Sequence, residues 1–155
     1  MVIVYYLFIN LSNKGDGSYN VYNRVDNMIS KMDSSSSKIQ KKNLDSSPDD
    51  TRKFEKGKVE IVNFGNMTIG RAIFEPGWSW SKCVKPIVNT NSCQAPHTQY
   101  VISGRLKVVM DDGTEEEFGP GDAAIIPPGH DAWVVGNESV VAIDFTGLKD
   151  YAKKE

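Results

Sequence analysis

Short strand-like runs separated by Gly- and Pro-containing turns fill residues 56–148. The run Lys58–Phe64 alternates apolar and polar residues, which is the period of a half-buried strand. Met67–Phe74 follows after a Gly65-Asn66 turn and is predicted as a second strand. Six further strands are predicted at Tyr100–Ser103, Leu106–Met110, Glu115–Phe118, Ala123–Ile126, Ala132–Val135 and Val140–Phe145. Eight strands in about 90 residues, with no helical pattern between them, predict a β-sandwich or small barrel.

Three turns fix the order of these strands. Asp111-Asp112-Gly113 is typical of a hairpin, because Asp and Gly tolerate the positive φ that such turns need. Residues 119–122 (GPGD) form a second predicted turn, and residues 127–129 (PPG) end the strand before them. The acidic residues around 111–117 are expected to form a solvated hairpin tip.

The first third of the chain has a different composition. Asn, Ser, Asp and Lys dominate residues 12–55, and too few apolar side chains are present to offset the entropy of ordering. We therefore expect a flexible extension at 1–55, a barrel at 56–148 and a C-terminal tail at 149–155 that ends in a short helix. Apolar residues at helical spacing predict a short helix within Val21–Met32.

Met1–Leu11 is the most apolar run, yet it is about half of the roughly 20 residues that a membrane span needs. It has no preceding Lys or Arg and no cleavage pattern, so we expect an added edge strand, or residues upstream of the natural start, rather than a membrane segment or signal peptide. Cytoplasm is the default location. The formal net charge of −2 gives no electrostatic basis for binding nucleic acid or an anionic membrane.

The turn pattern resembles the cupin superfamily. Tyr100-Val101-Ile102-Ser103-Gly104 is similar to the end of the first cupin motif, and the stretch from Gly119 to His130 (GPGD…IPPGH) is similar to the second. The resemblance covers about residues 56–148 and implies an all-β, double-stranded β-helix (jelly-roll) barrel preceded by a largely disordered extension. It also implies a ligand or metal inside the barrel.

The metal site departs from the family pattern. The family's His-x-His falls near Asn91 and Cys93, its Glu falls on His97, and its last His falls on Ala132, with His130 two positions earlier. Three of the four usual ligands are therefore changed and the fourth is shifted. The usual oxygenase chemistry of iron or manganese is not expected from these residues.

The four cysteines and histidines all lie in segments that would approach the barrel interior. As sulfur and nitrogen donors they suit a divalent metal, with zinc as the first choice. The alternative is structural: the thiols are buried hydrophobes or a disulfide, and the imidazoles hydrogen-bond within the barrel or hold the turn at 127–129. The predicted metal ligands are Cys83, Cys93, His97 and His130.

Aromatic and amide side chains near the same segments are predicted to bind a small molecule: Trp78, Trp80, Gln99, Tyr100 and Trp133. On a strand, Trp78 and Trp80 would face the same side, as a ligand-stacking mouth, a dimer face or part of the core.

Three functions remain open. The first is a small-molecule-binding barrel with a divalent metal, and the second is a metal-dependent isomerase, lyase or dioxygenase. The third is a non-catalytic sensor or interaction module with Trp78 and Trp80 at a partner face. No Gly-rich phosphate loop leads from a strand into a helix, so no nucleotide cofactor is expected. Homodimerisation is the default expectation for such a barrel.

Overall fold

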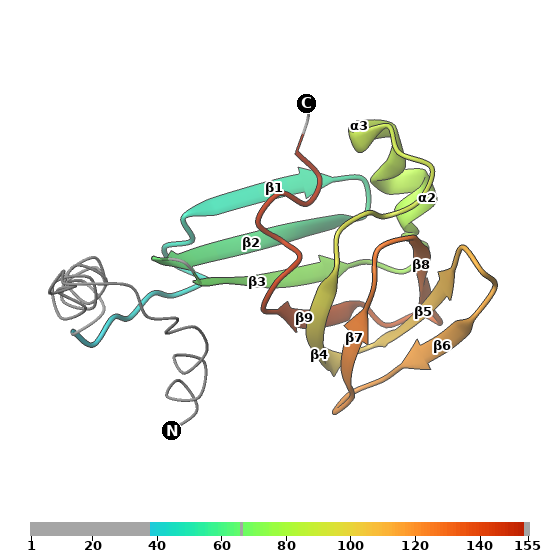
Figure 1. Ribbon diagram of the computed structural model, residues 1–155. Helices are drawn as coiled ribbons and strands as arrows, with labels where there is room; N and C mark the ends of the chain where they lie inside the picture. Colours follow the sequence, from blue (N-terminus) through green and yellow to red (C-terminus); the bar gives the residue numbers. More distant parts are fainter. Residues whose placement is uncertain (1–37, 66, 154–155) are drawn as a thin grey trace, which may run out of the picture. The chain divides into compact units, whose positions relative to one another are not determined.

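The computed structural model describes residues 38–65 and 67–153 (Figure 1). The expected helix at 21–32 and the expected edge strand at 1–11 lie outside the described residues. The described residues contain nine strands and two short helices. The strands are β1 (Asp50–Phe54), β2 (Gly57–Phe64), β3 (Met67–Phe74), β4 (His97–Ser103), β5 (Arg105–Met110), β6 (Glu115–Phe118), β7 (Ala123–Ile126), β8 (His130–Val135) and β9 (Val140–Asp144).

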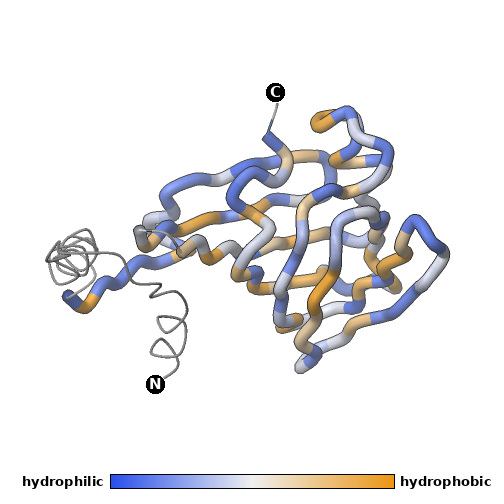
Figure 2. The backbone as a smooth tube through the Cα atoms, in the orientation of Figure 1, coloured by the Kyte–Doolittle hydropathy of each residue, from blue (hydrophilic) through white to orange (hydrophobic). Residues whose placement is uncertain are grey.

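The strands form two antiparallel sheets, which confirms the all-β prediction. One sheet has the order β1-β2-β3-β9-β4-β7, and the other has the order β6-β5-β8. Apolar side chains from the inner faces of both sheets form one core, including Ile61 of β2, Phe74 of β3, Leu106 of β5 and Val134 of β8. Figure 2 shows apolar residues concentrated along the strands and a hydrophilic tip on the β5–β6 hairpin, as the acidic residues there predict.

Two regions differ from the prediction. Strand β1 lies within the segment expected to be flexible, and it pairs in antiparallel register with β2 from Asp50–Ile61 to Phe54–Gly57. The contacts of the Phe54 ring with the rings of Phe74 and Tyr151 explain why β1 is ordered. The mostly polar composition of this segment did not indicate such a contact. Helices α2 (Trp80–Cys83) and α3 (Lys85–Val88) are single turns, too short to give a helical period.

The C-terminal residues also differ from the expected helical tail. Residues 146–153, here called the C-terminal strap, form turns and run from β9 past β3, β2 and β1 (Figure 1). Leu148 and Tyr151 of the strap belong to the buried core. No helix in the described part of the chain is long and apolar enough to cross a membrane.

Gly104 forms the corner at which the chain leaves one sheet for the other. It is the single residue between β4 and β5, and its φ is +71°. A Cβ atom there would lie 2.5 Å from the carbonyl oxygen of Ser139. Only glycine satisfies both the dihedral angle and the close backbone contact.

We predict that Gly104→Ala lowers the free energy of unfolding by about 3 kcal/mol, since backbone strain and a clash with fixed backbone add together. Gly113→Ala is the matched control. Gly113 also has a positive φ, but a Cβ atom added to it would have no neighbour within 4 Å, so strain alone costs about 1 kcal/mol. Urea denaturation measures both losses, and equal losses would contradict the role of the close contact.

Candidate metal centre

Three buried side chains from two separate segments converge inside the barrel. Cys93, His97 and His130 each offer one donor atom, and these atoms all lie within 4.8 Å of one another. A thiol and two imidazoles at this separation can hold one metal ion, since a zinc or copper ion binds sulfur and nitrogen donors of this kind. Together, Cys93, His97 and His130 are called the metal cluster below.

The backbone brings the cluster together at the ends of two strands. His97 is the first residue of β4 and His130 is the first residue of β8. Cys93 forms an isolated bridge with His130, in which the Cys93 N–H donates to the His130 carbonyl oxygen at 2.8 Å. The Gly129 N–H donates back to the Cys93 carbonyl oxygen at 2.7 Å. The turn at 127–129, which the sequence predicted, therefore positions two of the three donors.

Each imidazole is oriented by an acceptor at Nδ1. His97 Nδ1 lies 2.5 Å from Asp144 Oδ2, and His130 Nδ1 lies 2.7 Å from the Pro127 carbonyl oxygen. Because both partners only accept hydrogen bonds, each Nδ1 carries the proton, and the lone pair of the neutral ring is at Nε2. His97 Nε2 lies 3.7 Å from Cys93 Sγ. Such outer acceptors are typical partners of metal-binding histidines.

The ionisation of the cluster favours a thiolate. Burial alone would raise the pKa of Cys93, but hydrogen bonding to His130 and His97, and their charge, lower that pKa to about 6. Burial would lower the pKa of His97, but its hydrogen bonds to Asp144 and Cys93, and their negative charge, raise it to about 9. The thiolate is the form of cysteine that binds metals. Metal binding would release the proton from His97 Nε2.

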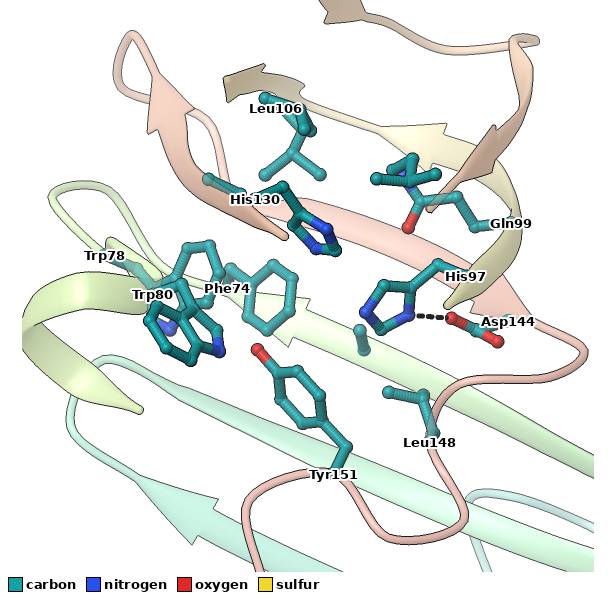
Figure 3. Close-up of a pocket in the computed structure, with 14 residues that line it drawn as sticks. Phe74, Trp78, Trp80, His97, Gln99, Leu106, His130, Asp144, Leu148 and Tyr151 are labelled. Carbon is teal, nitrogen blue, oxygen red and sulfur yellow. Dashed lines mark hydrogen bonds and ion pairs between the residues drawn. The ribbon is translucent and has the colours of Figure 1, made fainter. Parts of the chain in front are cut away.

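A small cavity adjoins the two imidazoles. Its volume is about 30 Å³, and His97, His130, Trp78, Gln99 and Tyr151 are among the residues that line it (Figure 3). This is room for one or two water-sized groups but not for an organic molecule. Gln99 Nε2 and Trp78 Nε1 are buried beside it without a hydrogen-bond partner. Buried donors of this kind are rare, and they indicate a place where a bound group is received.

Cys93 of the cluster also lines a larger groove. Its volume is about 610 Å³, and it is lined by Cys93 together with α2, α3, residues 94–96 and the strap. Trp80 and Tyr151 line both the groove and the small cavity. The two imidazoles of the cluster thus lie at the cavity, and Cys93 is among the residues that line the groove, although it is only 3% exposed.

The structure brings together some of the residues that the sequence singled out. Trp78, Trp80 and Gln99 line the cavity, whereas Tyr100 and Trp133 point outward with 45% and 36% of their surface exposed. Tyr100 follows Gln99 on β4, so it faces the opposite side of the sheet. Cys83 is buried in α2 and is not among the three clustered donors. Its role as a ligand stays a prediction.

The structure places Trp78 and Trp80 in the core, which is one of the three positions that the sequence left open. Trp78 and Trp80 are each only 2% exposed, and Trp78 stacks on Phe74 with ring centroids 3.8 Å apart. They do not share a strand, because Trp78 lies in the loop after β3 and Trp80 begins α2. The hypothesis of a partner face made from these two side chains is therefore wrong, since neither is accessible.

Sequence reasoning missed Asp144 and Tyr151. Asp144 is 2% exposed and faces inward at the end of β9, where its alternation with Ala142 and Val140 could have marked it as an inward polar residue. Tyr151 is 6% exposed, and Figure 3 shows its hydroxyl directed toward Trp80. Its pKa is raised well above the ordinary value, first by burial and then by nearby negative charge. No strand-like alternation marks Tyr151, which lies in a short stretch with Lys149, Asp150 and Lys153.

Comparison with known proteins identifies the fold. Residues 78–151 match the family model of the EutQ-like cupin domain. A crystal structure of a protein of unknown function from Rhizobium leguminosarum is 23% identical with a TM-score of 0.50, covering 71% of this chain and 97% of that one. At this identity the likeness concerns the fold alone.

Two further structures are more distant. A cupin-like protein from Thermotoga maritima is 17% identical with a TM-score of 0.45, covering 72% of this chain and 83% of that one. The polyketide cyclase RemF from Streptomyces resistomycificus is 19% identical with a TM-score of 0.48, covering 72% of this chain and 81% of that one. No curated protein matches the chain.

We predict that Gln99→Met raises the free energy of unfolding of the metal-free protein by about 1 kcal/mol, because it removes a buried donor without a partner while keeping the volume. Gln94→Met is the control. The Gln94 side chain is exposed and donates to Ser92, so its replacement brings no gain. Thermal and urea unfolding measure the difference, and a loss of stability in Gln99→Met would show that the amide serves the fold itself.

Proposed function

The chain carries a domain of the cupin superfamily, and we propose that this domain binds one divalent metal ion through Cys93, His97 and His130. The observation that carries the proposal is the orientation of the two imidazoles. Asp144 and the Pro127 carbonyl each occupy an Nδ1, so both rings offer Nε2 beside a buried thiol with a lowered pKa.

The donor set supports zinc as the first choice. One thiolate and two imidazoles leave a fourth tetrahedral position open, as in zinc sites that bind water or substrate. The same donors also suit copper, which forms sites with two imidazoles and one thiolate. Elemental analysis separates these two metals. When bound, such an ion supplies Lewis acidity and a more acidic water at neutral pH.

The chain's own residues would support that open position. The unpaired Gln99 amide is held at the cavity, where it can donate a hydrogen bond to a bound group. Trp80 and Tyr151 form the wall between the cavity and the groove and keep bulk water from the imidazoles. A bound ion in such a low-dielectric setting interacts more strongly with its ligands than it would in water.

A small-molecule ligand belongs in the groove. The sequence placed it inside the barrel, but the cavity of about 30 Å³ is too small for it. The groove of about 610 Å³ lies within the size range of small-molecule sites, and Cys93 connects it to the cluster. A metal-dependent isomerase, lyase or dioxygenase is the second candidate, favoured by the open coordination position. The proposed function is therefore the binding of a metal and a small molecule, and no reaction is assigned.

We predict that untagged protein purified without chelator contains about one equivalent of divalent metal per chain, measured by elemental mass spectrometry. His97→Ala is expected to lose it. Asp144→Asn is a sharper test, because the Asn amide nitrogen facing His97 would move the imidazole proton to Nε2 and weaken metal affinity by about 10- to 100-fold.

Cys83→Ala is the matched control, since Cys83 is the other buried thiol and lies outside the cluster. The Cys83→Ala variant should keep the metal if three ligands are sufficient. Loss of the metal from this variant would indicate that Cys83 is a fourth ligand. Metal-free wild-type protein that also fails to bind zinc, copper or manganese in titration would overturn the proposed function.

The outer face of the six-stranded sheet supports the predicted homodimer. Tyr100 and Ile102 of β4, Ile125 of β7 and Phe145 after β9 are exposed by 45%, 49%, 81% and 47%. They alternate with inward residues on neighbouring strands, so they share one face. Strand β7 is also an edge of that sheet. An apolar face beside a free edge is the kind of surface that a second copy of the chain would cover.

We predict that wild-type protein is a dimer in solution and that Ile125→Glu shifts it to monomer, because a charge would be buried at the interface. Light scattering after size exclusion, at several concentrations, measures the mass. Thr51→Glu, at an exposed position of β1 on the opposite edge of the sheet, is the control and should remain dimeric. Monomeric wild-type protein at high concentration would contradict the prediction.

A further inference from the structure

The C-terminal strap forms the wall between the metal cluster and the groove. Leu148 and Tyr151 project inward and line the small cavity, whereas residues 149, 150, 152 and 153 line the groove. Figure 3 shows Tyr151 extending across the barrel toward Trp80, below the two imidazoles. A molecule bound in the groove therefore meets the strap, and Tyr151 in particular, before it meets His97 and His130.

The strap is held by side-chain hydrogen bonds and by the burial of Leu148 and Tyr151, and it belongs to neither sheet. Arg52 of β1 donates to three strap carbonyl oxygens: those of Tyr151 and Leu148 through Nη1, at 2.5 and 3.2 Å, and that of Lys149 through Nη2, at 2.7 Å. Asp144 Oδ1 accepts the N–H groups of Thr146 and Gly147, both at 2.7 Å. The strap can therefore open without breaking a β-ladder.

The strap is fitted closely to the cluster. A Cβ atom on Gly147 would lie 2.4 Å from His97 Nδ1, and one on Gly70 would lie 2.5 Å from the Leu148 side chain. Ala152 has a φ of +53°, a conformation that costs energy for a residue with a Cβ atom.

From these contacts we infer that the C-terminal strap is a gate over the metal cluster, with Arg52 as its latch and Tyr151 as the residue that selects ligands by size. In the closed state only small molecules pass to the cavity. Opening joins the cavity to the groove and lets a larger ligand reach the open coordination position. The physiological role of the gate rests on the proposed function, whereas the gate itself can be tested without metal.

The test measures how fast two reagents modify Cys93 in metal-free protein, in a Cys83→Ala background so that only one thiol reacts. Methyl methanethiosulfonate is the small reagent and 5,5′-dithiobis(2-nitrobenzoate) is the bulky aromatic one. If opening is fast, the rate for the bulky reagent is proportional to the open fraction. We expect Tyr151→Ala to raise the bulky rate by about tenfold or more, with a much smaller change for the small reagent.

Arg52→Gln should raise the bulky rate by a similar factor, about tenfold, because it removes the latch and leaves the barrel intact. Tyr151→Phe keeps the ring and should react like the parent protein. The matched control is Arg105→Gln, an exposed arginine whose side chain pairs with Glu117, outside the strap and the cavity. It should change neither rate.

Unchanged bulky rates in both Tyr151→Ala and Arg52→Gln would overturn the gate. So would equal increases for both reagents that follow the global unfolding equilibrium measured in urea, since access would then come from unfolding. A protein that shows the gate but binds no metal would overturn the proposed function and leave the gate as a control of access to Cys93. The two failures are therefore distinguishable.

Discussion

The buried carboxylate of Asp144 holds the interior of the barrel together. It is 2% exposed, and a carboxylate at that depth is stable only if its oxygens are paired. Oδ2 accepts from His97 Nδ1, while Oδ1 accepts from the Thr146 and Gly147 N–H groups. One buried charge thus orients a cluster imidazole and anchors the start of the C-terminal strap.

This shared carboxylate couples the chemistry of the cluster to the closure of the barrel. Displacing the strap removes two donors from Asp144, which changes the field around His97. Changing the charge of the cluster changes how strongly Asp144 holds the strap. Linkage of this kind is reciprocal, so a ligand that opens the strap and an ion that binds the cluster would affect each other's affinity. Because the closed cavity is small, this coupling would decide whether a larger ligand can reach the cluster.

Some residues of the site could be predicted from the sequence and others could not, and the difference has physical reasons. The resemblance to the cupin superfamily, carried by the turns at 119–122 and 127–129, placed Cys93, His97 and His130 near the interior, because turn chemistry is a local property of a sequence. Tyr100 and Trp133 lie on strands that the sequence did predict, but they were chosen for their place near the site and not for their facing, and alternate residues of a strand point to opposite faces. Tyr151 was missed because its ring packs against Phe54 and His97, which are far away in the sequence and carry no periodic signal with it.

Local patterns in the sequence establish the all-β class, most of the strands from β2 to β9, the turns between them and the small set of residues that can bind a metal. These follow from alternation, from the positive φ that glycine permits and from a chain with only two cysteines and two histidines. Tertiary packing selects which three of those four donors meet, which acceptor orients each imidazole and which segment closes the barrel. Those outcomes depend on long-range pairing between Cys93 and His130 and between Asp144 and His97, and no local pattern encodes the distance between such partners.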